Sequence, residues 1–200
     1  MIRTLTVLAA LCAWTAPAAA QVRIGLRAGM TGSSTLVTDS IVQSISARPA
    51  PAPNLGFTLE NDLDSAWRVS LGFSTSWSQL SRRSVDSTEK IVPLTVWTPT
   101  VSLARVLPGS IIARATIGAV AYDPDHTDGN LFSGGAPILP LVGFGVGTER
   151  TAGNGLRMIL ELDYDLHQFT TTRLRDDGFS GAQTVHRLTL SLTLSRIAIN

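Results

Sequence analysis

Two histidines near the end of the chain have the residue types of a hydrolytic site. His167 and His186 flank a polar segment that contains Ser180 and several aspartates. A serine, a histidine and an acid can form a nucleophilic triad when the fold brings them within hydrogen-bond reach. No recognisable motif surrounds either histidine, and serines and histidines are common in loops. We therefore keep an enzyme only as an alternative interpretation.

Two other segments contain residues that could bind a cation or a phosphate group. The segment from Asp123 to Asp128 contains three aspartates and His126. Its spacing differs from that of a calcium loop, which needs acidic ligands at alternate positions and a later glutamate. The glycine run from Gly143 to Gly147 lacks the spacing and the following helix of a dinucleotide site. The sequence thus predicts no catalytic residue, no cofactor and no metal site, and it predicts that the glycines lie on a crowded strand face.

The end of the chain indicates which kind of element positions these residues. From His186 to Ser195 (HRLTLSLTLS), leucine occupies every second position and arginine, threonine or serine the others. This strict period of two is typical of a β-strand. The all-leucine face must lie against an apolar medium, which is either a protein core or the hydrocarbon of a membrane.

Seven more segments are predicted to be strands from the same alternation. They are Val22–Met30, Asn54–Glu60, Trp67–Trp77, Lys90–Leu107, Ile111–Tyr122, Ile138–Thr148 and Leu156–Leu166. The apolar residues change phase within the fourth of them. We therefore predict a bulge or kink near Thr98 and Pro99, because proline cannot donate to a β-ladder.

The connections between the eight predicted strands alternate in length. The long ones are Thr31–Pro53, Ser78–Glu89, Asp123–Pro137 and His167–Val185, and the short ones are Asn61–Ala66, Pro108–Ser110 and Glu149–Gly155. In an up-and-down meander, all long loops lie at one end, and all tight turns lie with both termini at the other. The sequence therefore predicts an all-β protein, an eight-stranded antiparallel up-and-down transmembrane β-barrel.

The polar faces of the predicted strands consist of small residues interrupted by isolated charges. Beyond the first 20 residues, Lys90 is the only lysine, whereas the surface strands of a soluble barrel usually carry lysine and glutamate freely. Small residues and charges of both signs suit a narrow, filled lumen in which arginines pair with carboxylates. The predicted lumen charge network is Arg23, Arg27, Glu60, Arg68, Arg114, Arg157, Glu161, Asp163 and Arg187. The alternative is a soluble secreted ligand-binding β-barrel with its apolar faces inward.

The first 20 residues indicate a secretory signal peptide. Arg3 supplies the positive charge, Leu5 to Trp14 form an apolar run, and Ala18 to Ala20 fit a cleavage site before Gln21. The predicted barrel domain is therefore residues 21–200. Cys12, the only cysteine, lies within the signal, so the mature chain is predicted to have no disulfide and no thiolate metal site.

The chain resembles the small eight-stranded outer-membrane barrels of the OmpA/OmpX type. The resemblance rests on the layout of strands and connections, on the opening strand IGLRAGM and on the closing strand LTLSLTL. The resemblance covers Gln21 to Asn200. It implies an outer-membrane location in a diderm, Gram-negative bacterium, with aromatic residues at the membrane interface. The interface aromatics expected here are Trp67, Trp77, Trp97, Tyr122 and Tyr164.

The resemblance also implies a structural or surface-interaction role and a set of partners. The expected partners are outer-membrane lipid, lipopolysaccharide and the barrel-insertion machinery, and the chain is expected to be a monomer. Four long extracellular loops would meet the outside. In one of them, Arg173 and Arg175 with Asp176 and Asp177 form a segment of mixed charge that either contacts a ligand or lipopolysaccharide or is simply solvated. A net charge of +1 gives no electrostatic case for nucleic acid. The enzyme alternative becomes a lipid A-modifying hydrolase or acyltransferase of the outer membrane.

Overall fold

The computed structural model describes residues 22–39, 45–83, 87–127, 131–132, 137–153, 155–176, 178 and 182–199. The predicted signal peptide, Asp128 and Ser180 lie outside the described residues. The strands are β1 (Val22–Ser33), β2 (Val37–Asp39), β3 (Ile45–Pro49), β4 (Ala52–Asp62), β5 (Trp67–Arg83), β6 (Thr88–Leu107), β7 (Ile111–Pro124), β8 (Ile138–Thr151), β9 (Arg157–Phe169) and β10 (Gln183–Ile199), and the short helix α2 spans Thr172–Asp176.

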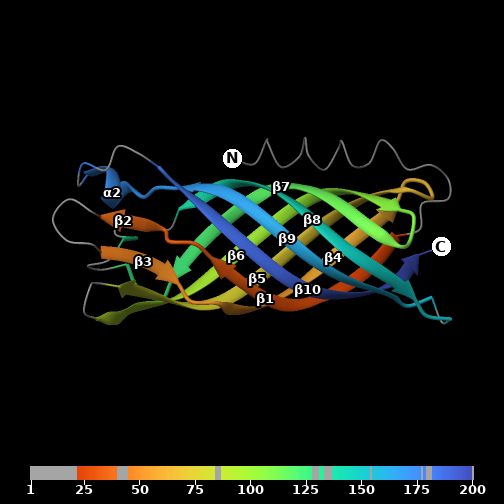
Figure 1. Ribbon diagram of the computed structural model, residues 1–200, viewed down its shortest axis with the longest axis horizontal. Helices are drawn as coiled ribbons and strands as arrows, with labels where there is room; N and C mark the ends of the chain where they lie inside the picture. Colours follow the sequence, from red (N-terminus) through yellow and green to blue (C-terminus); the bar gives the residue numbers. More distant parts are fainter. Residues whose placement is uncertain are drawn as a thin grey trace.

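Eight of these strands form a closed antiparallel barrel (Figure 1). β1 is hydrogen-bonded to β4, and each strand from β4 to β9 is hydrogen-bonded to the next. β1 also pairs with β10 along its whole length, which closes the ring. In the closing register, Leu26 lies opposite Leu194 and Met30 opposite Leu190. The predicted eight-stranded antiparallel barrel is therefore confirmed.

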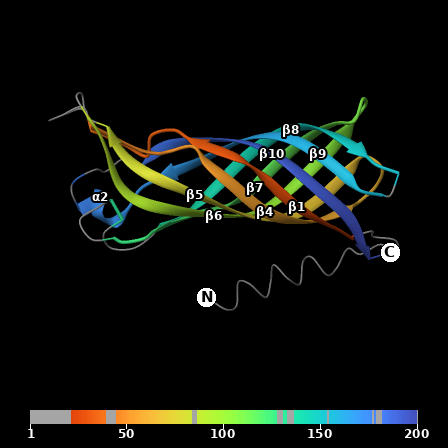
Figure 2. The ribbon, with the colours of Figure 1, turned by 90° about the horizontal axis from the view of Figure 1, so that it is seen from below.

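The two ends of the barrel differ in construction. One end carries the tight connections, including the Pro108–Ser110 turn in which Gly109 has a φ of 81°, and we refer to it as the turn end. The other, the loop end, carries β2, β3 and α2 (Figures 1 and 2). There β3 pairs with the last residues of β5, so the sheet continues past the point where β4 begins.

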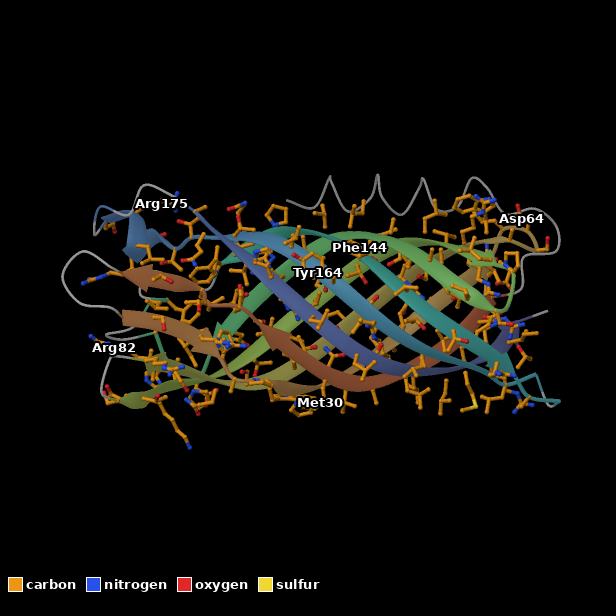
Figure 3. The ribbon with its side chains drawn as sticks, viewed as in Figure 1. Met30, Asp64, Arg82, Phe144, Tyr164 and Arg175 are labelled. Carbon is orange, nitrogen blue, oxygen red and sulfur yellow. The ribbon has the colours of Figure 1, made fainter. Side chains whose placement is uncertain are left out.

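Side chains alternate between the outside and the inside of the barrel, and the apolar ones lie outside. Leu188, Leu190, Leu192 and Leu194 are 39–53% exposed, whereas the threonines and serines between them are buried. Phe144 and Tyr164 likewise project from neighbouring strands on the outer surface (Figure 3), with ring centroids 5.3 Å apart. The residues of this apolar belt include Ile24, Leu26, Leu55, Phe57, Leu59, Leu71, Leu103, Ile117, Val142, Phe144, Val146, Met158, Leu160, Leu162, Leu188, Leu190, Leu192 and Leu194.

An outward apolar belt around a closed ring of strands fits hydrocarbon and does not fit water. The alternative of a soluble barrel with its leucines lining a cavity is therefore wrong. No helix among the described residues is long and apolar enough to cross a membrane.

The predicted bulge near Pro99 is not where the register shifts. Trp97 pairs with Ala121 and Thr100 with Gly118, so the register of β6 on β7 is the same on both sides of Pro99. The shift falls further up β6, where Leu80 pairs with Val92 but the next residue of β5 pairs with Lys90. The phase change in the sequence has another cause, because the apolar residues of β6 point inward near the loop end and outward in the belt.

The predicted long loops are largely ordered structure in the described residues. β5 runs to Arg83 and β6 begins at Thr88, so most of the predicted Ser78–Glu89 loop is strand. The first long loop contains β2 and β3, and the last contains the end of β9, α2 and the beginning of β10. The barrel therefore extends well beyond its apolar belt at the loop end.

Candidate functional site

The interior of the barrel is the best candidate for a site, because it gathers most of the charged side chains. All nine predicted network residues face inward: seven are buried, and the remaining two, Arg27 and Arg114, have side chains 18% and 9% exposed and contact interior carboxylates. They occupy three levels between the turn end and the loop end.

At the turn end, Arg157 organises a cluster of carboxylates. Its guanidinium donates one hydrogen bond to Glu60 and another, from Nη2, to Asp62 Oδ2 at 3.1 Å. Arg23 Nε lies 3.4 Å from the same Asp62 oxygen. Both partners of each pair are at least three-quarters buried, so the charges neutralise one another where water is scarce.

Arg68 holds a second part of this cluster. Its two terminal nitrogens donate to both oxygens of Glu149 at 2.6 and 2.9 Å, which is the bidentate geometry that favours arginine over lysine. Its Nε lies 3.1 Å from Asp62. The sequence prediction missed Asp62 and Glu149 because it assigned both to turns, although each continues the inward phase of its strand.

Asp62 and Glu149 each lie between several arginines. Asp62 contacts Arg23, Arg68 and Arg157, and Glu149 contacts Arg68 and Arg157. Each carboxylate therefore has opposite charges beside it, as a buried anion requires.

At the middle level, two arginines pair with two carboxylates of β9. Arg114 Nε donates to Glu161 at 2.6 Å and its Nη1 to Ser70 Oγ at 3.1 Å. Arg27 contacts Asp163, which is two residues further along β9 on the same inward face. Beside these pairs lies a cavity of about 40 Å³, and its lining includes Arg27, Arg114, Arg187, Asp163, Asp165 and hydroxyls of neighbouring strands.

The glycines of β8 make room for this level. A Cβ on Gly143 would collide with the carboxylate of Asp165, and one on Gly145 with the carboxylate of Asp163. The run from Gly143 to Gly147 lies within β8, so it is not a phosphate-binding turn. Its glycines leave the lumen wide enough for the acidic side chains of the adjacent strand.

Towards the loop end, the polar residues of the lumen form hydrogen-bonded pairs. Arg187, which is 3% exposed, donates from Nη1 to Thr98 Oγ1 at 3.0 Å. Thr31 and Thr189 share a hydrogen bond of 2.9 Å. Above them, the Tyr122 hydroxyl lies 2.7 Å from His167 Nε2.

An apolar core fills the barrel beyond this polar section. Tyr122 packs edge-on against Phe169 at 5.3 Å and lies 6.1 Å from Phe132 between ring centroids. The buried residues of the loop-end core are Leu36, Ala47, Leu80, Val92, Leu94, Val96, Val120, Tyr122, Phe132, Leu139, Leu141, Phe169, Leu174 and Val185. The predicted interface position of Tyr122 is therefore wrong, because its ring belongs to this core, whereas Trp77 is 48% exposed on the outer surface.

The histidines do not form one site. His186 is on the outer surface, where its Nδ1 lies 2.5 Å from the Tyr164 hydroxyl, and His167 is buried inside the barrel. His167 pairs with Val185, the residue before His186, so the two imidazoles lie on opposite faces of the sheet. The two histidines therefore cannot contribute to one and the same catalytic site.

Asp123 accepts a hydrogen bond of 3.3 Å from Trp97 Nε1 at the outer surface. In the described part of the chain, no group of three or more histidine, cysteine, aspartate or glutamate side chains is placed to hold a metal ion. The aspartates of the segment from Asp123 to Asp128 that can be described therefore do not form such a group.

No protein-family model and no curated protein matches the sequence. Solved structures do match the fold. Neisserial surface protein A is 10% identical with a TM-score of 0.56, and the match covers 88% of this chain and 96% of that one. The outer membrane protein OprG of Pseudomonas aeruginosa is 11% identical with a TM-score of 0.54, with coverage of 90% and 98%. The outer membrane protein AlkL is 15% identical with a TM-score of 0.52, with coverage of 94% and 97%.

These similarities establish the architecture. The chain has the fold of the small outer-membrane β-barrels, as its resemblance to the OmpA/OmpX type implied. Together with the outward apolar belt, this fold makes the chain an outer-membrane β-barrel protein and agrees with the predicted location in the outer membrane.

Proposed function

We propose that this outer-membrane barrel is a monomer with a closed interior, and that its function lies in surface interaction through its loop end. The observation that carries the proposal is the two-part filling of the barrel. Ion-paired charges occupy the section inside the apolar belt, and an apolar core occupies the section beyond it.

The polar section inside the apolar belt offers solutes little room. Eight strands enclose an interior that side chains can fill. The cavity of about 40 Å³ in the middle level is large enough for about three water molecules, each needing roughly 10–15 Å³. Arg114 and Arg27 reach across it to carboxylates of β9, so a solute would have to break ion pairs to pass.

The loop-end core opposes the passage of ions by a different means. Leu36, Leu80 and Phe132 are 0% exposed, and Val92 and Val120 pack in the same core. An ion that crossed this core would lose its hydration without gaining polar partners, which is costly in an apolar medium. The folded loop end, with β2, β3 and α2 around this core, is instead suited to hold a fixed surface towards the outside.

We propose outer-membrane lipid and lipopolysaccharide as the partners of this surface, and the barrel-insertion machinery as a transient partner during assembly. Arg175 of α2 is exposed at the loop end (Figure 3), as a contact with phosphorylated sugars would require. No step of this function needs a cofactor.

Planar-bilayer recording tests the closed interior. Purified protein is reconstituted, and its insertion is verified by heat-dependent gel mobility and by resistance of the barrel to added protease. The expected result is a membrane whose conductance stays at the lipid baseline as the protein density rises. Discrete conductance steps that increase in number with the amount of inserted protein would contradict the proposal.

A further inference from the structure

Three cations lie together on the outer face of the barrel, above its apolar belt. Arg48 of β3 and Lys90 of β6 both pair with Ser81 of β5, so they lie in one row on either side of it. Arg83 is two positions further along β5 on the same face. Neighbouring strands are about 4.8 Å apart, which places the three backbones within roughly 10 Å of one another. We call Arg48, Arg83 and Lys90 the outer basic patch.

The alternation of burial fixes the direction of these side chains. Ala47 and Pro49 are buried on either side of Arg48, which is exposed. Leu80, the neighbour of Ser81, is 0% exposed in the loop-end core. Arg48, Ser81 and Lys90 therefore face away from the core, towards whatever surrounds the barrel.

The outer basic patch differs from most of the interior cations, because the described residues give it no carboxylate partner. Arg23, Arg27, Arg68, Arg114 and Arg157 all form ion pairs, whereas no ion pair among the described residues includes a member of the patch. The described outward residues around it are Ser46, Gln79, Ser81, Thr88, Pro93 and Thr95, which are all uncharged. Glu89, the neighbour of Lys90, is exposed but lies in the opposite phase of the strand, where it is paired with Arg82. On the outer face, the described residues therefore place no carboxylate beside the three positive charges.

The height of the patch above the belt determines which layer of the membrane lies beside it. Trp77 of β5 and Trp97 of β6 are the outward aromatic residues at the upper edge of the belt on these strands, where such residues mark the membrane interface. Ser81 is four residues beyond Trp77, which is about 13 Å along the strand. With a strand tilt of about 40°, the patch lies roughly 10 Å above the interface aromatics. Headgroups of ordinary phospholipids extend only about 5–8 Å beyond the hydrocarbon.

We propose that the outer basic patch binds phosphate groups of lipopolysaccharide, at the level of its phosphorylated sugars. Arginine pairs with phosphate through two parallel N–H donors, and lysine adds a point charge. Arg48 Nε donates to the Ser33 carbonyl at 2.9 Å, which fixes the guanidinium and leaves its terminal nitrogens for a ligand. The proposal rests on the proposed function, because it requires the loop end to face the lipopolysaccharide leaflet.

A binding titration with two matched variants tests the patch. The full chain in detergent is titrated with fluorescent rough lipopolysaccharide, which consists of lipid A and inner-core sugars, in a chelating buffer at low salt. One variant combines Arg48→Gln, Arg83→Gln and Lys90→Gln. The control removes the same charge from the outer surface at the turn end, by Arg105→Gln, Arg150→Gln and Arg196→Gln. Heat-dependent gel mobility verifies that both variants are folded.

Each basic residue at an anionic surface contributes roughly a factor of five to binding, so the patch variant is expected to lose about 100-fold in affinity. The control is expected to change by less than about threefold, and lipopolysaccharide treated with phosphatase is expected to bind the parent and the patch variant alike. Equal affinity in the parent and the patch variant would overturn the inference, as would an equal loss in the control.

Two further measurements complete the design. One identifies the source of the phosphate, and the other distinguishes failure of the patch inference from failure of the proposed function. Competition by inorganic phosphate, or by phosphatidylglycerol vesicles at the same phosphate concentration, would also overturn the choice of lipopolysaccharide. If the patch variant binds normally while the parent stays inserted and non-conducting, only the patch inference fails. Conductance steps in the parent would instead contradict the closed interior and leave the binding result standing.

Discussion

The ion pair between Arg114 and Glu161 is the interior contact whose removal should have the largest effect. Its nitrogen and oxygen lie 2.6 Å apart, and the side chains are 9% and 1% exposed. Removing one partner of such a buried pair leaves the other charge without compensation, which costs about 3–5 kcal/mol. Arg27 and Asp163 form a neighbouring pair that can relieve part of this cost. We therefore expect Arg114→Met and Glu161→Gln each to lower the free energy of unfolding by about 3 kcal/mol.

The double variant should be more stable than the sum of the single effects predicts. With both charges removed, the remaining pair of Arg27 and Asp163 is balanced and no uncompensated charge remains in this level. We expect a coupling energy of about 2 kcal/mol, within the range for residues in direct contact. The assay is reversible urea unfolding in lipid vesicles, followed by the fluorescence of Trp67, Trp77 and Trp97 as they leave the membrane interface.

Arg105→Met supplies the control, because it removes a charge from the outer surface. Arg105 is exposed and lies 5.3 Å from the ring centroid of Trp67, a cation–π contact that contributes about 0.5–1 kcal/mol at such sites. Single effects at Arg114 and Glu161 no larger than that of Arg105, and additive with each other, would refute the assignment of a coupled buried pair.

Three further predictions follow from the belt, the turn end and the glycines. Leu190→Arg places a charge on the lipid side and should lower the free energy of unfolding in vesicles by about 2–4 kcal/mol. Asp62→Asn removes a carboxylate that contacts Arg23, Arg68 and Arg157 and leaves their charges less compensated, so it should lower the urea midpoint at pH 7. Gly145→Val should prevent the change of gel mobility that marks a folded barrel, whereas Gly153→Val, where a Cβ meets open space, should not.

The outward half of the structure was predictable because lipid imposes a simple rule on it. A strand with hydrocarbon on one face and a crowded lumen on the other must alternate with period two, and Leu188 to Leu194 do so without exception. The inward direction of Arg157 and Glu161 followed from the same parity. The pairing of these charges did not follow, because it depends on the closing register and on which side chains meet across the lumen.

The loop end was not predictable by that rule, because its medium changes. Val92, Leu94 and Val96 are apolar and point inward, so their phase is opposite to that of Val101 and Leu103 in the same strand. A change of environment along a straight strand therefore gave the same signal as a bulge. β2, β3 and α2 are three to five residues each, too short for periodicity to separate them from loops.

The direction of the side chains in the closing strand can be measured at two adjacent residues. Single cysteines at positions 190 and 191 carry a nitroxide, in protein that is produced from Gln21 onward so that Cys12 is not included, and that is reconstituted in vesicles. Relaxation enhancement by oxygen and by a water-soluble nickel complex is compared at the two positions. We predict high oxygen accessibility at Leu190→Cys, which faces hydrocarbon, and low accessibility to both agents at Ser191→Cys, which is 2% exposed in the lumen. High nickel accessibility at position 191, or protection of position 190 from oxygen, would contradict an apolar belt in lipid around a filled interior.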